Sequence, residues 1–419
     1  HLSRENGIAV IYQEFTLVPV LSAAENIFMG DFPMKGAALD QKEMVKRTNQ
    51  LFEKLNIKID PNTLVSDLTT GYQQMVEIAK ALSRNAKLLI MDEPSAPLTT
   101  SEVEAMFRVV DTLKMQGVTI IYISHRMKEI FRLSDRVSVM RDGNYITVRN
   151  TKETDEKELI KLMVGRELNE TFPPRDLKIG ETLLKIEELT GNGVKDISLE
   201  VKEGEILGLA GLIGAGRTEL AQLIFGYGRI DSGKMYFEGK EYLPHMPSDA
   251  IKQGIALVPE DRKRQGLVLE MSILQNSTMA LLKSISSMSV IDKKKENKIT
   301  DEYIESLSIK TPGSSQKVKN LSGGNQQKVV LAKWLAVQPK LLIFDEPTRG
   351  IDVGAKQEIY MIMSELVHMG KTIIIISSEM EELIGMSDRI IVLAGGRISG
   401  ELKKEEFSQE LILEKSAKG

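Results

Sequence analysis

Hydrophobic residues in this chain gather in short continuous runs separated by longer mixed segments. The clearest runs are KLLIMDE (87–93), VTIIYIS (118–124), EILGLAG (205–211), KLLIFDE (340–346) and KTIIIIS (371–377). Runs of this length, apolar on both faces, are typical of buried parallel strands. Segments between them, such as 102–117, carry apolar residues at helical spacing. Strands that alternate with helices predict an α/β fold that binds ligands at the carboxyl ends of its strands.

The same order of segments occurs twice. The repeated pairs are LTTGYQQ (68–74) with LSGGNQQ (321–327), LLIMDEP (88–94) with LLIFDEP (341–347), and TIIYISH (119–125) with TIIIISS (372–378). Each pair is separated by 253 residues, and GIAVIYQ (7–13) returns after 247 residues as GIALVPE (254–260). Because several blocks repeat in one order, the sequence predicts two copies of one domain.

We expect the first domain at 1–165, a linker at 166–182 and the second domain at 183–419. The linker prediction rests on a polar stretch that contains Pro173 and Pro174. The second copy has 79 residues ahead of Glu260, counted from about Glu181, whereas the first has 12 ahead of Gln13. We therefore expect that the first copy lacks about 67 residues at its front, including a phosphate loop.

The composition of the chain excludes several classes of function. The chain has 419 residues, 27% of them charged, with a net charge of −4 and no cysteine. A disulfide framework, thiolate metal ligands and a cysteine nucleophile are therefore excluded, and nothing in the charge suggests a nucleic-acid partner. The longest apolar runs have the length of a strand and are too short to span a bilayer.

One glycine-rich segment follows an apolar run and precedes a helical pattern. It reads GLIGAGRT, from Gly211 through Leu212, Ile213, Gly214, Ala215, Gly216 and Arg217 to Thr218. Such a loop turns backbone N–H groups and a helix N-terminus toward phosphate, and Thr218 offers a hydroxyl group to Mg²⁺. Arg217 replaces the lysine of a standard phosphate loop. Alone, the segment is equally consistent with a structural turn.

Two acidic pairs end apolar runs, and each lies 24 residues after an LSGG-like block. We expect Asp92 and Asp345 to hold Mg²⁺, and Glu93 and Glu346 to polarise the attacking water. In the block LSGGNQQK, Ser322, Gly323 and Gly324 open a helix and could present hydroxyl and N–H groups to a phosphate. By itself this block is typical of an ordinary helix N-cap.

Together these stretches resemble the nucleotide-binding subunits of ABC importers, and in particular the fused double-cassette ATPases of ribose-, galactose- and xylose-type sugar importers. The stretches that carry the resemblance are GLIGAGRTEL (211–220), VPEDRK (258–263), LSGGNQQK (321–328), DEPTRGIDVGAK (345–356) and SSEMEEL (377–383). The resemblance implies ATP and Mg²⁺ as ligands. It implies two tandem ABC-type P-loop ATPase domains, each a RecA-like core with a helical subdomain.

In such proteins each ATP lies between the phosphate loop of one cassette and the signature of the other. The resemblance implies a first site that contains Gln13, Asp92, Glu93 and His125 together with the signature 321–325. Gln13 would sense the metal and the water, and His125 would contact the γ-phosphate. The implied second site contains Arg217, Glu260, Asp345, Glu346 and Ser378 together with the altered signature LTTGY (68–72).

The second site departs from the family pattern at four places. Arg217 replaces lysine, Glu260 replaces glutamine, Ser378 replaces histidine, and Thr69, Thr70 and Gly71 replace Ser-Gly-Gly. Thr70 places a side chain where glycine would let the backbone approach a phosphate. Glu260 would bring a carboxylate near metal and phosphate. We therefore expect the first site to hydrolyse ATP and the second to bind nucleotide with slow or no turnover.

The resemblance also implies membrane permease subunits and a periplasmic or lipoprotein sugar-binding protein as partners. The chain would lie at the cytoplasmic face of the cell membrane as a peripheral subunit. Two alternatives stay open at this point. One is a soluble double-cassette ABC protein that acts on ribosomes or DNA, which the short tether and the unequal sites disfavour. The other is a nucleotide-binding regulatory remnant.

Overall fold

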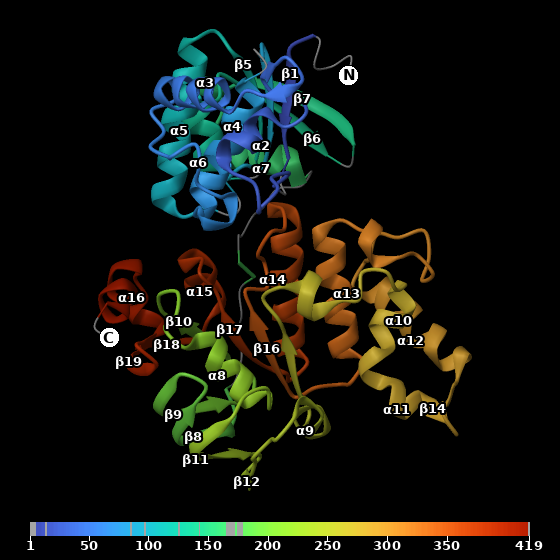
Figure 1. Ribbon diagram of the computed structural model, residues 1–419. Coiled ribbons are helices and arrows are strands. Elements are labelled where there is room, and N and C mark those ends of the chain that lie inside the picture. Colours follow the sequence, from blue (N-terminus) through green and yellow to red (C-terminus); the bar gives the residue numbers. More distant parts are fainter. Residues whose placement is uncertain are drawn as a thin grey trace. The chain divides into compact units, whose positions relative to one another are not determined.

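The computed structural model describes residues 6–12, 15–83, 86–95, 98–124, 126–141, 143–164, 172–173 and 179–417. The chain divides into two compact units, His1–Glu167 and Leu168–Gly419. In Figure 1 the first unit runs from blue to teal and the second from green to red.

A small parallel sheet forms the centre of the first unit. Its strands are β1 (Ile8–Ile11), β4 (Leu88–Asp92) and β5 (Thr119–Ile123), in the order β1-β4-β5. Two hairpins accompany it, β2 (Met34–Lys35) with β3 (Ala38–Leu39), and β6 (Arg136–Arg141) with β7 (Asn144–Asn150). The helices are α2 (Ala23–Phe28), α3 (Gln41–Lys54), α4 (Thr70–Leu82), α5 (Thr100–Met115), α6 (Met127–Leu133) and α7 (Glu156–Val164).

A six-stranded sheet forms the core of the second unit, in the order β13-β16-β17-β10-β18-β19. Its strands are β10 (Ile206–Ala210), β13 (Ile255–Val258), β16 (Leu341–Asp345), β17 (Thr372–Ile376), β18 (Arg389–Ala394) and β19 (Arg397–Lys403). All neighbouring pairs are parallel except β18 and β19. Strand β10 pairs with β17 on one side and with β18 on the other, although neither is next to it in the sequence. The carboxyl end of β10 therefore lies near the middle of the sheet.

Antiparallel strands and helices complete the second unit. The strands are β8 (Thr182–Gly191), β9 (Val194–Lys202), β11 (Ile230–Phe237) and β12 (Lys240–Glu241) in one sheet, and β14 (Ser286–Ser287) with β15 (Val290–Ile291) in a hairpin. The helices are α8 (Arg217–Ile224), α9 (Pro247–Gln253), α10 (Ile273–Thr278), α11 (Leu282–Ile285), α12 (Lys293–Ser306), α13 (Gly323–Leu335), α14 (Val353–His368), α15 (Met380–Met386) and α16 (Gln409–Ser416).

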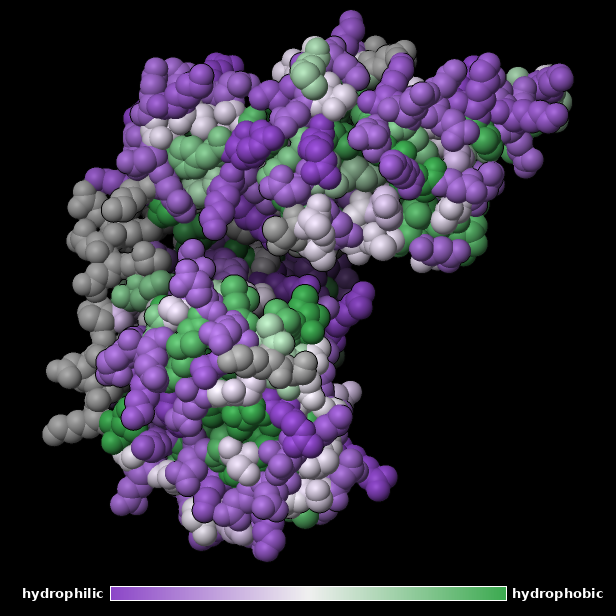
Figure 2. Space-filling view, turned by 90° about the vertical axis from the view of Figure 1, so that its left-hand side faces the viewer, coloured by the Kyte–Doolittle hydropathy of each residue, from purple (hydrophilic) through white to green (hydrophobic). Residues whose placement is uncertain are grey.

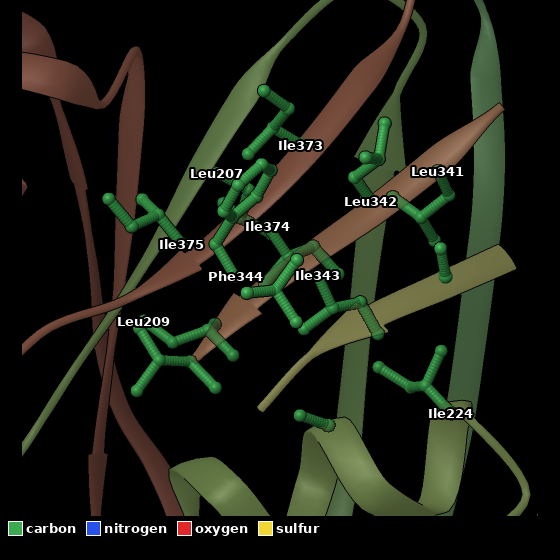
Figure 3. Packing of buried hydrophobic residues seen from close by; sticks show 14 of the residues in the cluster. Leu207, Leu209, Ile224, Leu341, Leu342, Ile343, Phe344, Ile373, Ile374 and Ile375 are labelled. Carbon is green, nitrogen blue, oxygen red and sulfur yellow. The ribbon is translucent and has the colours of Figure 1, made fainter. Parts of the chain in front are cut away.

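The core of the second unit lies where β10, β16 and β17 meet. Their side chains point toward one another in Figure 3, with Leu207, Phe344 and Ile374 among those labelled. Every residue of β10, β16 and β17 is buried. Burying apolar surface contributes about 25 cal/mol for each Å² removed from water. Continuous apolar runs therefore become the central strands, as the sequence predicts.

Corresponding strands of the two units differ in their neighbours. In the second unit, β17 pairs with β16 on one side and with β10 on the other. Among the described strands of the first unit, β5 pairs with β4 alone. Ile121 and Ile123 of β5 are consequently 47% and 46% exposed. The first unit thus lacks, within its described residues, a strand equivalent to β10.

The helical segment that follows β1 or β13 begins in the same way in both units. Ser22 and Glu25 form a capping box at α2, and Ser272 and Gln275 form one at α10. Reciprocal caps of this kind satisfy the free N–H groups of a helix N-terminus. The repeat therefore extends to local hydrogen bonding in the helical subdomains.

Phe172, inside the predicted linker, packs on the second unit. Its ring centroid lies 5.2 Å from that of Tyr360 in α14. A Cβ atom added at Gly385 of α15 would lie 2.3 Å from the Phe172 ring. Glycine at position 385 therefore provides the space that this aromatic ring occupies.

No helix in the described part of the chain combines the length and the apolar character needed to cross a bilayer. The face shown in Figure 2 is covered mainly by hydrophilic residues, with hydrophobic residues interspersed among them.

Candidate functional site

The segment Gly211–Thr218 connects β10 to the start of α8, at the middle of the six-stranded sheet. Gly211, Gly214 and Gly216 have φ angles of 151°, 80° and 102°. These values lie in the left-handed region, where glycine is favoured because it has no Cβ. A Cβ on Gly211 would lie 2.5 Å from the carbonyl oxygen of Leu393. The glycines are therefore required by the backbone path of the loop.

The side chains of this loop point in different directions. Leu212 and Ile213 are 51% and 93% exposed, whereas Ala215 is buried. The Arg217 side chain is also buried, and its Nη1 donates a hydrogen bond of 2.9 Å to the carbonyl oxygen of Ser377. Arg217 therefore connects the start of α8 to the end of β17, in a position where a standard phosphate loop has lysine.

Asp345 lies buried at the carboxyl end of β16, beside the first turn of α8. Burial raises the pKa of its carboxyl group to about 6, and a hydrogen bond from the Thr218 side chain partly opposes that rise. Oδ1 of Asp345 is buried without a hydrogen-bond partner among the described residues. A buried carboxylate oxygen without a partner beside a hydroxyl group is an arrangement suited to a divalent cation.

Glu346 follows with a strained backbone. Its φ is 48°, which is uncommon for a residue other than glycine, and its N–H donates to the carbonyl oxygen of Ile376 at 2.9 Å. The Ser378 hydroxyl donates to Oε2 of Glu346 at 3.0 Å. Burial raises the pKa of this carboxyl group, and the Ser378 backbone and the Arg217 charge lower it. The contact joins two residues that the sequence assigns to one site.

The first unit repeats this backbone conformation at Glu93. Its φ is 45°, and its N–H donates to the carbonyl oxygen of Ile123 at 2.9 Å. Asp92 ends β4 directly before it. Strained residues of this kind persist where the surrounding structure holds them, and they concentrate at functional sites. Gln13 and His125 lie outside the described residues, so their positions are not part of this geometry.

Glu260 follows β13 and forms an ion pair with Arg349, in the loop after β16. Arg262 reaches the same loop: its Nη1 donates to the carbonyl oxygen of Arg349 at 2.7 Å, and its Nη2 to that of Gly350 at 2.9 Å. The two loops are therefore joined by one ion pair and two charged hydrogen bonds. The sequence predicted Glu260 as a site residue but gave no sign of this pairing.

The signature of the second unit opens α13. Ser322 has the extended conformation of a helix cap, and its Oγ accepts a hydrogen bond of 2.9 Å from Nδ2 of Asn325. A Cβ on Gly323 would lie 2.8 Å from Nη2 of Arg262, and a Cβ on Gly324 would lie 2.6 Å from that of Ala355. Both glycines thus let other segments approach the start of this helix closely.

The altered signature of the first unit opens α4 in a different environment. Oε1 of Glu102 accepts hydrogen bonds from the Gly71 N–H at 3.0 Å and from the Thr69 hydroxyl at 3.1 Å. Glu102 belongs to α5, and its Oε2 accepts from the Thr99 N–H at 3.0 Å. A carboxylate of the same unit therefore lies against the start of this helix.

We call His125 and the corresponding Ser378 the switch positions, and a buried glutamate lies four residues after each of them. In the first unit, Glu129 accepts hydrogen bonds from Tyr122 at 2.8 Å and Ser124 at 3.0 Å, and forms an ion pair with Arg126 at 3.4 Å. In the second unit, both carboxylate oxygens of Glu382 are buried, and neither has a well-aligned hydrogen-bond donor among the described residues, although the Ser377 and Thr348 side chains lie close enough to act on the carboxyl group. Burial raises the pKa of Glu382 to about 7, and the Ser377 and Thr348 side chains partly oppose that rise.

Sequence reasoning missed Arg262, Arg349, Glu102 and the pair Glu129 and Glu382 as candidates. Two of these residues, Glu102 and Arg349, could have been found by comparing the two copies of the repeat, because the copies differ at their positions. Glu102 corresponds to Ala355, and Arg349 corresponds to Ala96. Differences between the copies, at positions that were not themselves candidate site residues, thus point to contacts that only one copy makes.

Comparisons with known proteins identify the family of the chain. The ABC transporter family matches residues 1–96 and 194–349. The ribose import ATP-binding protein RbsA of Geobacillus kaustophilus is 46% identical over 420 residues, which is 100% of this chain and 85% of that protein. The xylose import ATP-binding protein XylG of the same organism is 48% identical over 419 residues, which is 98% of this chain and 83% of that protein.

Among solved structures, the ATP-binding cassette MJ1267 of an ABC transporter is similar with a TM-score of 0.50 and 23% identity. The match covers 56% of this chain and 98% of that cassette, and it concerns the fold alone. The double-cassette relatives match nearly the whole chain, and the family matches a segment in each copy of the repeat. The chain therefore belongs to the ABC transporter family, as an ATP-binding subunit with two tandem cassettes that hydrolyses ATP.

Proposed function

We propose that the chain powers import of a monosaccharide, as the ATP-hydrolysing subunit of a transporter whose membrane permeases are separate proteins. The names of the relatives support ribose or xylose as the substrate class. The proposal places the chain at the cytoplasmic face of the cell membrane and includes an extracytoplasmic sugar-binding protein as a further partner. Selection of the sugar would then rest with those partners.

The observation that carries the proposal is the repeated Asp-Glu pair at the end of β4 and β16. In both units the glutamate has a positive φ and donates its N–H to the strand that precedes the switch position. A carboxylate held in this way is suited to accept a proton from an attacking water. We assign this role to Glu93 in the first site, which we expect to hydrolyse ATP. Gln13 and His125 would act on the reacting phosphate in the same site.

We propose that the two ATP sites are unequal. Several features support a second site with little turnover. Arg217 is engaged with the Ser377 carbonyl oxygen, Glu260 is paired with Arg349, and Ser378 occupies the switch position. Thr70 adds a side chain to the altered signature. The segment 211–218 would still bind phosphates through its backbone N–H groups.

Mg²⁺ is the metal that the proposed activity requires. The residues of the second unit fit it, because Asp345 has a buried carboxylate oxygen without a partner beside the Thr218 hydroxyl. Asp92 would have the same part in the first unit. When bound with ATP, the ion would neutralise phosphate charge. The carboxylates of Asp92 and Asp345 would orient it, with Glu93 and Glu346 next in the chain.

The test compares ATPase rates of the complete transporter carrying Glu93→Gln or Glu346→Gln. General base catalysis typically contributes about 100-fold or more to a rate. We expect Glu93→Gln to lower kcat by about that factor and Glu346→Gln to lower it by less than about threefold. Equal losses in both variants would contradict the assignment of unequal sites. An active Glu93→Gln variant would contradict the proposed role of Glu93.

A second measurement separates import from the alternative of a protein that acts on ribosomes or DNA. Addition of the sugar-loaded binding protein should stimulate the ATPase of the chain when it is assembled with its permeases in a bilayer. Stimulation by ribosomes or DNA, with no response to the sugar-binding protein, would contradict import.

A further inference from the structure

The two signature helices differ in what lies against their first turns. In the first unit the neighbour is Glu102 of α5, and at the corresponding place in the second unit it is Ala355 of α14. Glycine is common to both helices at this point, as Gly71 and Gly324. A Cβ on Gly71 would lie 2.5 Å from the Glu102 carboxyl group, and one on Gly324 would lie 2.6 Å from the Ala355 Cβ. The two positions are therefore spatially equivalent.

The Glu102 carboxylate satisfies polar groups at the start of α4. Oε1 accepts from the Gly71 N–H at 3.0 Å and from the Thr69 hydroxyl at 3.1 Å. Oε2 accepts from the Thr99 N–H at 3.0 Å and from the Thr99 hydroxyl at 2.9 Å. These bonds, led by that from the Thr99 backbone, lower the pKa of Glu102, so the group is an anion at neutral pH.

The groups that Glu102 engages are those that a signature offers to a phosphate. The first N–H groups of a helix attract anions, because they are unpaired within the helix and lie at the positive end of its dipole. In α4 the Gly71 N–H and the Thr69 hydroxyl already have an anionic acceptor. In α13 the corresponding neighbour is a methyl group, which competes for no hydrogen bond.

We propose that Glu102 is an internal anion that occupies the phosphate-binding groups of the altered signature and keeps the second ATP site from closing on nucleotide. The inference rests on the proposed function and on the arrangement that the family resemblance implies, in which the signature of one cassette completes the ATP site of the other. A γ-phosphate would have to displace Glu102 from the Gly71 N–H and the Thr69 hydroxyl. It would also approach a like charge, which is repulsive wherever solvent is excluded. Thr70 is a separate, steric obstacle.

A reciprocal exchange tests this role. Glu102→Ala gives the first unit the residue found in the second, and Ala355→Glu does the reverse. In the complete transporter we expect Ala355→Glu to lower kcat for ATP at least tenfold. The neutral variant Ala355→Gln has the same size and should retain most of the activity. An equal loss in Ala355→Glu and Ala355→Gln would overturn the proposal, because bulk and not charge would then be responsible.

The gain of function is measured at the second site. In a Glu93→Gln, Glu346→Gln background that retains ATP, we expect Glu102→Ala or Glu102→Gln to raise the affinity for the second equivalent of nucleotide at least tenfold. Adding Thr70→Gly should raise it further. Glu104→Ala, which changes an exposed residue of the same helix, should have no effect. Unchanged affinity in both Glu102 variants would overturn the proposal.

A local measurement separates this inference from the proposed function. In the 419-residue chain, Glu102→Ala should speed amide hydrogen exchange at Gly71 at least tenfold and leave residues 211–218 unchanged. Unchanged exchange at Gly71 would show that the contact itself is wrong, whatever the protein does. Loss of ATPase in Glu93→Gln together with unaltered second-site affinity in Glu102→Ala would overturn the role of Glu102 and leave the proposed function standing.

Discussion

Glu129 and Glu382 occupy the same place in the two cassettes, four residues after the switch position, yet their surroundings differ. Arg126 pairs with Glu129 at 3.4 Å. The residue that corresponds to Arg126 in the second cassette is Glu379, whose carboxylate pairs with Lys356 at 2.6 Å. The charge of Glu129 is thus compensated by a direct partner, whereas Glu382 is buried beside a further acid. Burial of a carboxylate that has no cation paired directly with it favours the protonated form.

This difference predicts how stability depends on pH. The folded protein raises the pKa of Glu382 from 4.5 to about 7, so protonated Glu382 is favoured by folding. Its contribution to the unfolding free energy is fully present below pH 4.5 and is lost as pH rises through about 7. Glu382→Gln should therefore raise the unfolding free energy by about 1–3 kcal/mol at pH 8 and change it little at pH 5.

Denaturant unfolding of the second unit at the two pH values checks this prediction. Glu381→Gln, a substitution at the exposed neighbouring residue, serves as the control and should behave like the wild type at both pH values. If Glu382→Gln is destabilised at pH 8 and at pH 5, Glu382 is ionised and needed in that form.

At the scale of elements, the loop after β13 is held to two other segments. Arg262 donates to two carbonyl oxygens of the loop after β16, and Glu260 pairs with Arg349 of that loop. Nζ of Lys333, in α13, donates to the carbonyl oxygen of Gly266 at 2.5 Å. The first cassette has Phe15 at the position of Arg262. These contacts tie the loop after β13 to the turn that follows Glu346 and to the signature helix of the second cassette.

Arg262→Ala should therefore loosen the turn that follows Glu346. Hydrogen bonds from charged groups contribute about 1.5–3 kcal/mol each, and two are lost together here. We expect amide exchange at residues 348–351 to rise at least tenfold. Because Arg262 is only partly buried, water replaces part of what is lost, and the second unit should lose roughly 2–4 kcal/mol of stability, less than the full sum of the two bonds. Exchange at 211–218 should not change.

Arg264→Ala removes an exposed arginine from the same loop and should leave both quantities unaltered. The lysine in Arg262→Lys can reach only one carbonyl oxygen at a time. The amide exchange of this variant at residues 348–351 and its stability should therefore lie between those of the wild type and those of Arg262→Ala. Equal exchange at residues 348–351 in Arg262→Ala and the wild type would show that the turn is held without Arg262.

The elements themselves could be predicted from the sequence because their causes are local. The apolar run at 340–346 becomes β16, and the glycines of 211–218 adopt the positive φ angles that such a loop requires. The contacts of Arg217 with Ser377 and of Glu102 with Gly71 join residues far apart in the chain. No spacing rule encodes them, because a long side chain at a given position can turn toward several partners. For such long-range contacts, the differences between the two copies of the repeat were the only information that the sequence offered.

At the scale of the whole chain, the two units are built from the same repeat but differ in how completely their sheets are covered. The six strands of the second sheet include β10, β16 and β17, which are buried along their whole length. Among its described residues the first unit has three strands in its central sheet. Val10 of β1 and Tyr12, directly after β1, are 39% and 58% exposed, in addition to the isoleucines of β5. Less apolar surface is removed from water in the first unit, so its folded state gains less.

Unequal burial predicts two steps of thermal unfolding, with the first unit unfolding at the lower temperature. ATP should raise only the second transition, because the phosphate loop at 211–218 belongs to the second unit. At a concentration of about 100 times Kd, a ligand stabilises the folded state by about 2.7 kcal/mol, which for a unit of this size corresponds to a shift of roughly 5–10 °C.

Calorimetry of the 419-residue chain with and without MgATP makes the measurement, and amide exchange assigns each step to a unit. Thr218→Ala removes the hydroxyl group beside Asp345 and should reduce the shift without changing the order of the steps, since the first unit contains no part of this loop. A shift of the lower transition by ATP would mean that the first unit binds nucleotide without a loop of this kind. A single transition would mean that the two units unfold together, so that the burial within each does not set the order of unfolding.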